Sequence, residues 1–298
     1  MALTKKQFDI LTLLEGSGAP KSQREISNIT GISLGSVNKH MAELVKLLYV
    51  EEGKITDLGK EALEPYRVKR AVFMAAGFGS RMVPITLNTP KPLVRIKGKR
   101  IIDSLLDAVV SAGIEEIYIV RGYLSEQFDQ LLKKYPKLVF IDNPLYNETN
   151  NISSAYCARH LLTNCYVFEA DLVLYNPKLI TKYQYETNYL GVYVDRTEDW
   201  CFVTDPDATI KKMGIGGVDC YHMYGVSFWT EEDGKKLSKH IDEVYNNVPG
   251  GKEKYWDQVV FDCFPREYKI HVRPCTFSDI VEIDTFNELK KIDPNYAM

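Results

Sequence analysis

The sequence lacks the features that would place it in a membrane or send it out of the cell. No run of about 18 consecutive apolar residues occurs, whereas a membrane-spanning helix needs about 20. The first residues, Met1 to Lys6, are not followed by the apolar core of a signal peptide. These absences exclude a membrane partner from the prediction and favour a cytoplasmic protein.

Cysteine and net charge are also sparse. The six cysteines are scattered without close pairs, so the sequence predicts buried reduced thiols rather than a disulfide framework or a zinc site. The net charge is −3, so the chain as a whole is not predicted to bind a polyelectrolyte through its charge. With 298 residues, the chain is long enough for one large domain or two smaller ones.

Residues 1 to about 66 favour helices. Phe8, Leu11 and Leu14 share one helix face, and Ser22 with Glu25 predicts a capping box at the start of a second helix. Ser33 is expected to cap a third helix. Its predicted apolar stripe consists of Val37, Met41, Leu44, Val45 and Leu48. Because residues 49–56 suit a short hairpin, the segment resembles a winged helix-turn-helix domain.

This resemblance implies that the third helix could enter the major groove of DNA. Its candidate contacts are Ser33, Ser36, Asn38, Lys39 and His40. Residues 1–68 hold nine Lys/Arg and nine Asp/Glu, so they offer little net charge to neutralise phosphates. DNA binding and a protein-contact role both stay open, and a homodimer is compatible with such a module.

Strands alternate with helices from residue 67 to 298. Buried strands are expected at residues 71–75, 114–120, 138–141 and 166–169, and helices at 101–112, 125–135 and 153–162. This alternation predicts an α/β domain with a mostly parallel sheet. Ligands bind such sheets at the carboxyl ends of the strands. The predicted domains are therefore 1–66 and 67–298.

A glycine-rich loop follows the first of these strands. Its backbone could approach a polyphosphate closely, and its predicted nucleotide contacts are Ala75, Ala76, Gly77, Gly79 and Ser80. Arg81 adds a cation that can bind phosphate in a bidentate manner, and Lys91 adds a second between two prolines. Met82 occupies the third glycine position of a dinucleotide fingerprint, and the Gly-Lys-Ser/Thr ending of a P-loop is absent.

The full pattern, Ala-Ala-Gly-x-Gly-Ser-Arg and then Thr-Pro-Lys-Pro, resembles nucleoside-triphosphate transferases that make sugar nucleotides and CDP-alcohols. Later motifs within about residues 69–292 resemble the bacterial CTP:phosphocholine cytidylyltransferases of choline decoration. The resemblance implies a Rossmann-like nucleotidyltransferase fold, CTP as substrate, and Arg81 and Lys91 as catalytic cations. It also suggests that Gly122, Tyr123, Asn150 and Asn151 read the nucleotide.

Two acids are predicted to hold Mg²⁺. Asp171 directly follows the strand at 166–169, and carboxylate oxygens suit this cation. The resemblance pairs Asp171 with Asp284, although Asp284 could instead cap a helix over residues 285–292. Glu282 is a weaker candidate ligand.

The resemblance implies that an acceptor phosphate attacks the α-phosphorus of CTP and that pyrophosphate leaves. Choline carries a quaternary ammonium, which aromatic faces and carboxylates would recognise. The acceptor candidates are Trp200, Tyr224, Tyr255, Trp256 and Asp257, and core packing is the alternative for each aromatic residue. Trp229 lies in an apolar strand and is expected in the core. Phosphocholine is the predicted acceptor, while 2-aminoethylphosphonate, phosphoethanolamine and a sugar 1-phosphate stay open.

A rival hypothesis makes the chain a nucleotide-sensing DNA-binding regulator without catalytic activity. Its test is whether the catalytic set is complete. Arg81, Lys91, Asp171 and Asp284 are all present, which favours an enzyme.

Overall fold

The computed structural model describes residues 2–296 and divides into two units. The first comprises Met1–Arg67 together with Tyr183–Tyr185, and the second comprises Val68–Lys182 and Glu186–Met298. The first unit is a small helical domain with a hairpin, and the second is an α/β domain. No sequence pattern indicated that residues 183–185 belong with the N-terminal segment.

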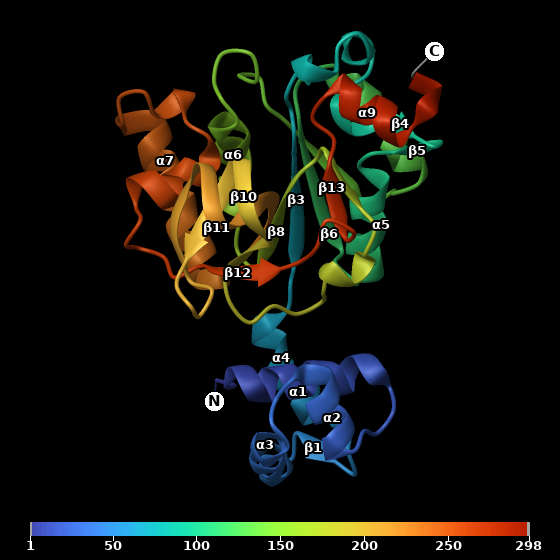
Figure 1. Cartoon of the computed structure of the whole chain (residues 1–298), viewed down its shortest axis with the longest axis vertical. Coiled ribbons are helices and arrows are strands. Elements are labelled where there is room, and N and C mark those ends of the chain that lie inside the picture. The colour runs from blue at the N-terminus through green and yellow to red at the C-terminus, as the bar shows by residue number, and fades with distance from the viewer. Residues whose placement is uncertain (1, 297–298) are drawn as a thin grey trace. The chain divides into compact units, whose positions relative to one another are not determined.

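The N-terminal unit contains three helices, a short hairpin and a fourth helix (Figure 1). These elements are α1 (Lys5–Ser17), α2 (Gln23–Thr30), α3 (Leu34–Lys46), β1 (Val50–Glu51), β2 (Lys54–Ile55) and α4 (Asp57–Leu63). The predicted capping box of Ser22 and Glu25 is confirmed at α2. Ser33 is the N-cap residue of α3, as predicted, but its side chain makes no cap hydrogen bond.

The predicted stripe on the third helix is shorter than expected. Val37, Met41 and Leu44 are buried at a spacing of four and three residues, which keeps them on one helix face. Val45 is 50% exposed because it lies one position past that face. Leu48 is 64% exposed and follows the end of the helix at Lys46.

Three residues from the middle of the chain complete the N-terminal core. Tyr183 is buried in the same cluster as Phe8, and the ring of Tyr185 stacks on Tyr66 with centroids 5.4 Å apart. The Tyr185 hydroxyl donates to the carbonyl oxygen of Leu3 at 3.0 Å. The folded N-terminal unit therefore includes residues that follow it by more than a hundred positions.

A seven-stranded sheet forms the centre of the second unit, in the order β12-β10-β11-β8-β3-β6-β7. Its strands are β3 (Arg70–Ala75), β6 (Glu116–Arg121), β7 (Leu138–Asp142), β8 (Cys165–Glu169), β10 (Asn188–Thr204), β11 (Ile210–Trp229) and β12 (His271–Pro274). Neighbouring strands are parallel except where β11 pairs antiparallel with β8 and β10. The prediction of a mostly parallel α/β sheet is confirmed.

Helices cover both faces of this sheet (Figure 1). On the inner strand β3, Phe73 packs into the core that includes Leu105, whereas Val72 packs into the core that includes Leu237. Both faces of β3 are thus buried, as expected for an inner parallel strand. The helices are α5 (Asp103–Ser111), α6 (Ile152–Ala158), α7 (Glu231–Asn247), α8 (Trp256–Gln258) and α9 (Phe286–Ile292).

Two small antiparallel pairs complete the unit. They are β4 (Arg95–Ile96) with β5 (Lys99–Arg100), and β9 (Leu172–Leu174) with β13 (Ile280–Glu282). The helix expected over residues 125–135 is a 3₁₀ helix over Ser125–Lys133. Within residues 2–296, all six cysteines are free and no helix has the length and apolarity to cross a membrane.

Candidate active site

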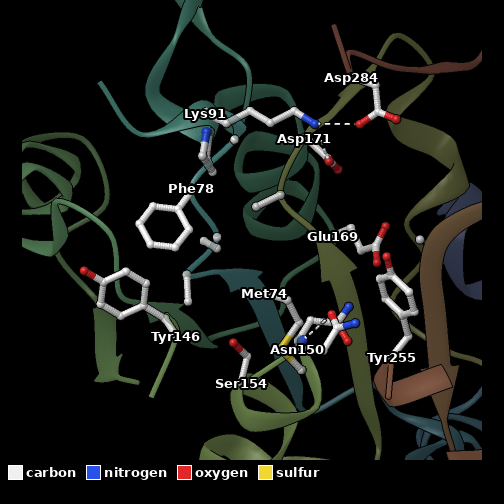
Figure 2. A pocket seen from close by; sticks show the side chains of 18 of the residues that line it. Met74, Phe78, Lys91, Tyr146, Asn150, Ser154, Glu169, Asp171, Tyr255 and Asp284 are labelled. Atoms are coloured by element: carbon white, nitrogen blue, oxygen red, sulfur yellow. Dashed lines mark hydrogen bonds and ion pairs between the residues drawn. The ribbon is translucent and has the colours of Figure 1, made fainter. Parts of the chain in front are cut away.

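A cavity of about 670 Å³ lies where β3 and β8 end. Figure 2 shows several of the side chains that line it. The structure brings most of the predicted site residues to this cavity. They are Ala75, Ala76, Gly77, Gly79, Ser80, Arg81, Lys91, Asn150, Asn151, Asp171, Trp200, Tyr255, Asp257 and Asp284.

The glycine-rich loop forms one wall, and its shape depends on Gly79. This residue has a φ of +63°, and a Cβ there would lie 2.9 Å from the Cβ of Lys91. Thr86 also holds the loop, since its hydroxyl donates to the carbonyl oxygen of Gly79 at 2.8 Å. Gly79 therefore lets the loop lie directly against the segment that carries Lys91.

Lys91 is buried and ion-paired with two carboxylates. Its Nζ lies 2.7 Å from Asp171 Oδ2 and 2.8 Å from Asp284 Oδ1 (Figure 2). Burial alone would lower the pKa of Lys91, but the two carboxylates outweigh it and raise the pKa. Arg81 is largely exposed and pairs with the other oxygen of Asp284 at 2.7 Å.

Pairing between β9 and β13 brings Asp284 to Asp171. Glu282 lies opposite Leu172 in this ladder, and the Ile283 amide donates to the Asp171 carbonyl at 3.1 Å. Helix α9 is capped by the hydroxyl of Thr285, not by Asp284. The carboxylate of Asp284 is therefore available to the two cations.

A carboxylate cluster beside this ion pair could hold a divalent metal ion. Glu169, Asp171 and Glu282 each offer an oxygen, and the three oxygens lie within 4.8 Å of one another. Burial, followed by the charge of Asp171, raises the pKa of both Glu169 and Glu282 well above the usual value. Asp171 Oδ1 is buried without a hydrogen-bond partner. An orphaned oxygen among crowded acids fits the oxygen-rich site that a hard cation requires.

Gly225 makes room for one member of this cluster. It is the strand residue before Val226, which pairs with Phe168, and it therefore lies beside Glu169. A Cβ at Gly225 would lie 2.5 Å from the carboxylate of Glu169. The Glu169 carboxylate can therefore occupy its position only because residue 225 has no side chain.

Aromatic and acidic side chains line another part of the cavity. The rings of Trp200 and Tyr255 meet edge-on with centroids 5.7 Å apart. Asp257 is buried, and one of its oxygens accepts a hydrogen bond from the Tyr189 hydroxyl at 2.7 Å. Burial raises the pKa of Asp257 to about 7, although the Tyr189 hydrogen bond acts in the opposite direction.

Four predicted site residues do not line the cavity. Tyr224 is buried and donates to the Ile280 carbonyl, and Trp256 is a core residue that packs near Tyr189. Gly122 lies against the ring of Tyr146, where a Cβ would come within 2.6 Å. The Tyr123 amide donates to the Ala76 carbonyl at 3.1 Å, so it supports the loop from outside.

Several residues that line the cavity were not predicted from the sequence. Glu169 stands two positions before Asp171, and Asp199 directly precedes Trp200, so their positions beside assigned residues could have indicated them. Phe78, at the variable position of the glycine-rich motif, and Tyr146, which no motif included, have ring centroids 5.3 Å apart (Figure 2). Trp229 is fully buried, as predicted.

Two families match separate parts of the chain. The Nucleotidyl transferase family matches residues 70–192, and the Winged helix-turn-helix DNA-binding family matches residues 3–47. The first match lies in the α/β unit except for residues 183–185, and the second lies within the helical unit.

Curated relatives and a solved structure resemble the larger part of the chain. A 2-aminoethylphosphonate cytidylyltransferase of Lancefieldella rimae is 37% identical over 76% of this chain and 93% of its own length. A choline-phosphate cytidylyltransferase of Streptococcus pneumoniae is 33% identical over 75% and 96%. The solved structure of CTP:phosphocholine cytidylyltransferase from Streptococcus pneumoniae matches with a TM-score of 0.70 and 32% identity, covering 77% of this chain and 99% of that one.

The carboxylate cluster predicts pH-dependent binding of a divalent cation. With Mn²⁺ as the probe and no nucleotide, Asp171→Asn and Glu282→Gln should each weaken binding by at least about tenfold, because each removes a ligand. Affinity should also fall as pH is lowered, since the raised pKa values of Glu169 and Glu282 let protons compete with the metal. Calorimetry or electron paramagnetic resonance would measure the dissociation constants.

Glu115→Gln, at an exposed acid outside the cavity, is the matched control and should leave Mn²⁺ affinity unchanged. A loss of affinity in Asp284→Asn but not in Glu282→Gln would contradict the cluster. That result would favour the pair of Asp171 and Asp284 instead.

Proposed function

Since the chain belongs to the cytidylyltransferases of the nucleotidyl transferase family, we propose that it transfers a cytidylyl group from CTP to a small cationic acceptor. The acceptor carries a phosphonate or phosphate at one end and an amine at the other. The observation that carries this proposal is a single cavity with a cationic glycine-rich loop on one wall and Trp200, Tyr255 and Asp257 on another.

The loop, Arg81 and Lys91 suit the triphosphate. Backbone amides of residues 76–80 can bind phosphate oxygens, and the two cations offset the charge that develops during the reaction. In Figure 2, Phe78 and Tyr146 lie together away from Asp284, which leaves aromatic surface for the base. Asn150 and Asn151 line the same cavity and complete the proposed nucleotide contacts.

The proposed reaction is one in-line displacement. An acceptor oxygen forms a bond to the α-phosphorus of CTP, the bond from that phosphorus to the bridging oxygen breaks, and pyrophosphate leaves with the electron pair. The acceptor oxygen is already anionic, so the chain needs positioning and charge neutralisation rather than a strong general base. We assign Mg²⁺ to the site of Asp171, where it would neutralise phosphate charge.

2-Aminoethylphosphonate is the acceptor that the cavity favours. A primary ammonium donates hydrogen bonds, and Asp199 and Asp257 offer carboxylates to accept them. A quaternary ammonium instead requires aromatic faces on several sides. Of the four aromatic acceptor candidates, Tyr224 and Trp256 are buried in the core, which leaves Trp200 and Tyr255 at the cavity.

Phosphocholine, the acceptor predicted from the sequence, is the second candidate. The edge-on pair of Trp200 and Tyr255 supports it, because a trimethylammonium group can pack against both rings. The choline-phosphate relatives resemble the chain over most of their own lengths.

Pyrophosphate release with CTP and each acceptor in turn would test the proposed function. We expect 2-aminoethylphosphonate to give the highest kcat/KM, followed by phosphocholine and phosphoethanolamine, while glucose 1-phosphate should give no release above background. CTP should be used in preference to UTP. Release with none of the aminoalkyl acceptors would reject the proposed acceptor class, and a faster reaction with phosphocholine would reverse the order of the two candidates.

Replacing Lys91 tests the proposed nucleotide end. Lys91→Ala should lower kcat with CTP by roughly 10²–10³-fold, because it removes a fixed cation from the reacting phosphates. Lys137→Ala, at an exposed lysine outside the cavity, should retain full turnover. Near-normal turnover of a folded Lys91→Ala protein, checked by circular dichroism, would contradict the role.

For the N-terminal unit we propose DNA binding through α3. The match of residues 3–47 to a DNA-binding winged helix-turn-helix family supports it. Three predicted contacts, Ser33, Asn38 and Lys39, are exposed. His40 and Ser36 are partly buried and hydrogen bond to Glu43 and Lys6, respectively. We therefore expect them to contribute less to DNA binding than the sequence predicted.

A gel-shift titration with DNA from upstream of the coding sequence would test this proposal. We expect binding that weakens steeply with salt, because phosphate contacts release counterions. Lys39→Ala should weaken binding, whereas the exposed Lys137→Ala in the α/β unit should not. The absence of a shift at low salt, with and without CTP, would rule out the proposal.

A further inference from the structure

Asp257 is held by a buried hydrogen bond from the core of the α/β unit. The Tyr189 hydroxyl donates to Asp257 Oδ1 at 2.7 Å. The side chain opposite Tyr189 in the sheet is also held, since Trp229 Nε1 donates to Ser227 Oγ at 3.0 Å. Because an ionised carboxylate can only accept, the Tyr189 hydroxyl gives its one proton to Asp257.

The sheet explains why these groups meet. Tyr189 lies on β10 directly opposite Ser227 on β11, and Trp229 is two residues further along the same strand. Residues with this spacing share one face of a sheet. Tyr189, Ser227 and Trp229 are each at most 1% exposed, so water does not compete for the hydrogen bonds.

Packing also fixes the direction of the Tyr189 hydroxyl. Its ring contacts Phe202, Trp229 and Phe261 at centroid distances of 5.4 to 6.0 Å. It also stacks on Trp256 at 6.2 Å, and Trp256 directly precedes Asp257 in α8. An aromatic ring enclosed in this way has little freedom to change rotamer. The side chain therefore presents its hydroxyl to Asp257 in one fixed position.

We propose that Tyr189 is a positioning residue for acceptor specificity, which fixes Asp257 as the carboxylate that binds the ammonium end of the acceptor. The inference rests on the proposed function, because it assumes a cationic acceptor. Asp257 lines the cavity together with Trp200 and Tyr255. With Oδ1 bound to Tyr189, the carboxylate cannot rotate freely, and its orientation toward the acceptor is set by the core.

The test compares two ligands that differ only in the ammonium group. Calorimetry would measure the binding of 2-aminoethylphosphonate and of propylphosphonate, in which a methyl replaces the ammonium, to the full chain saturated with α,β-methylene-CTP. Wild type should prefer the amine, and Tyr189→Phe should lower that preference by roughly tenfold, since a hydrogen bond to a charged group is lost. Asp257→Asn should lower it at least as far.

Two further variants separate positioning from folding. Tyr135→Phe removes another buried tyrosine hydroxyl that donates to carboxylates, those of Asp103 and Asp107, and it should leave the preference unchanged. Ser227→Ala changes the side chain opposite Tyr189 and keeps the Tyr189 hydroxyl, so it should lower the preference by less than Tyr189→Phe. If Tyr189→Phe does not fold, Asp257→Asn decides the matter, because an unchanged preference in that variant would overturn the inference.

Equal weakening of both ligands by Tyr189→Phe, or no change, would overturn the inference. So would a wild type that does not distinguish the ligands or binds neither. The proposed function is judged separately by pyrophosphate release. If that assay selects phosphocholine, then phosphocholine and 3,3-dimethylbutyl phosphate, in which carbon replaces the cationic nitrogen, replace the phosphonate pair.

Discussion

The ion pairs of Lys91 connect three distant parts of the α/β unit. Asp171 follows β8, Asp284 follows β13, and the two acids lie 80 and 193 residues from Lys91 in the sequence. A buried lysine requires such partners, because an unpaired buried charge is strongly unfavourable. Gly79 allows the phosphate loop to lie against the same lysine. The loop, the acids and the C-terminal segment are thus arranged around one ammonium group.

The proposed nucleotide and metal sites share these charged groups, so binding at one would affect binding at the other. A triphosphate that recruits Lys91 competes with Asp171 and Asp284 for the same charge. Six carboxylates line the cavity: Glu169, Asp171, Asp199, Asp257, Glu282 and Asp284. The cationic side chains in that lining are Arg81 and Lys91. An anionic substrate in such a cavity needs added positive charge, which a divalent cation beside Asp171 and an ammonium beside Asp257 would supply.

The sequence could predict those site residues that lie close together in one motif. The glycine-rich loop, Arg81 and Lys91 follow one strand, and residues close in sequence at a strand end face the same cavity. The order of strands and helices also predicted the mostly parallel sheet, because hydrophobic periodicity depends on local spacing. These predictions needed no knowledge of which distant segments meet.

The motifs did not predict which of their side chains face the cavity and which face the core. Tyr224 and Gly225 are neighbours on β11, yet Tyr224 packs into the core while Gly225 lies at the cavity, because successive strand residues face opposite sides. Around α8, Tyr255 and Asp257 reach the cavity while Trp256 packs into the core between them. The three-residue motif of Tyr255, Trp256 and Asp257 therefore predicted the correct segment of the site, but its middle residue does not face the cavity.

The segment that completes the N-terminal core leads directly into the strand that carries Tyr189. Tyr185 stacks on Tyr66 within the N-terminal unit, and only three residues separate it from Tyr189. Tyr189 is the second residue of β10, which also carries Asp199 and Trp200 to the cavity. Because residues 183–185 are part of the N-terminal core, the chain passes between the two units on both sides of this segment as well as after residue 67. Each unit is therefore built from more than one stretch of sequence.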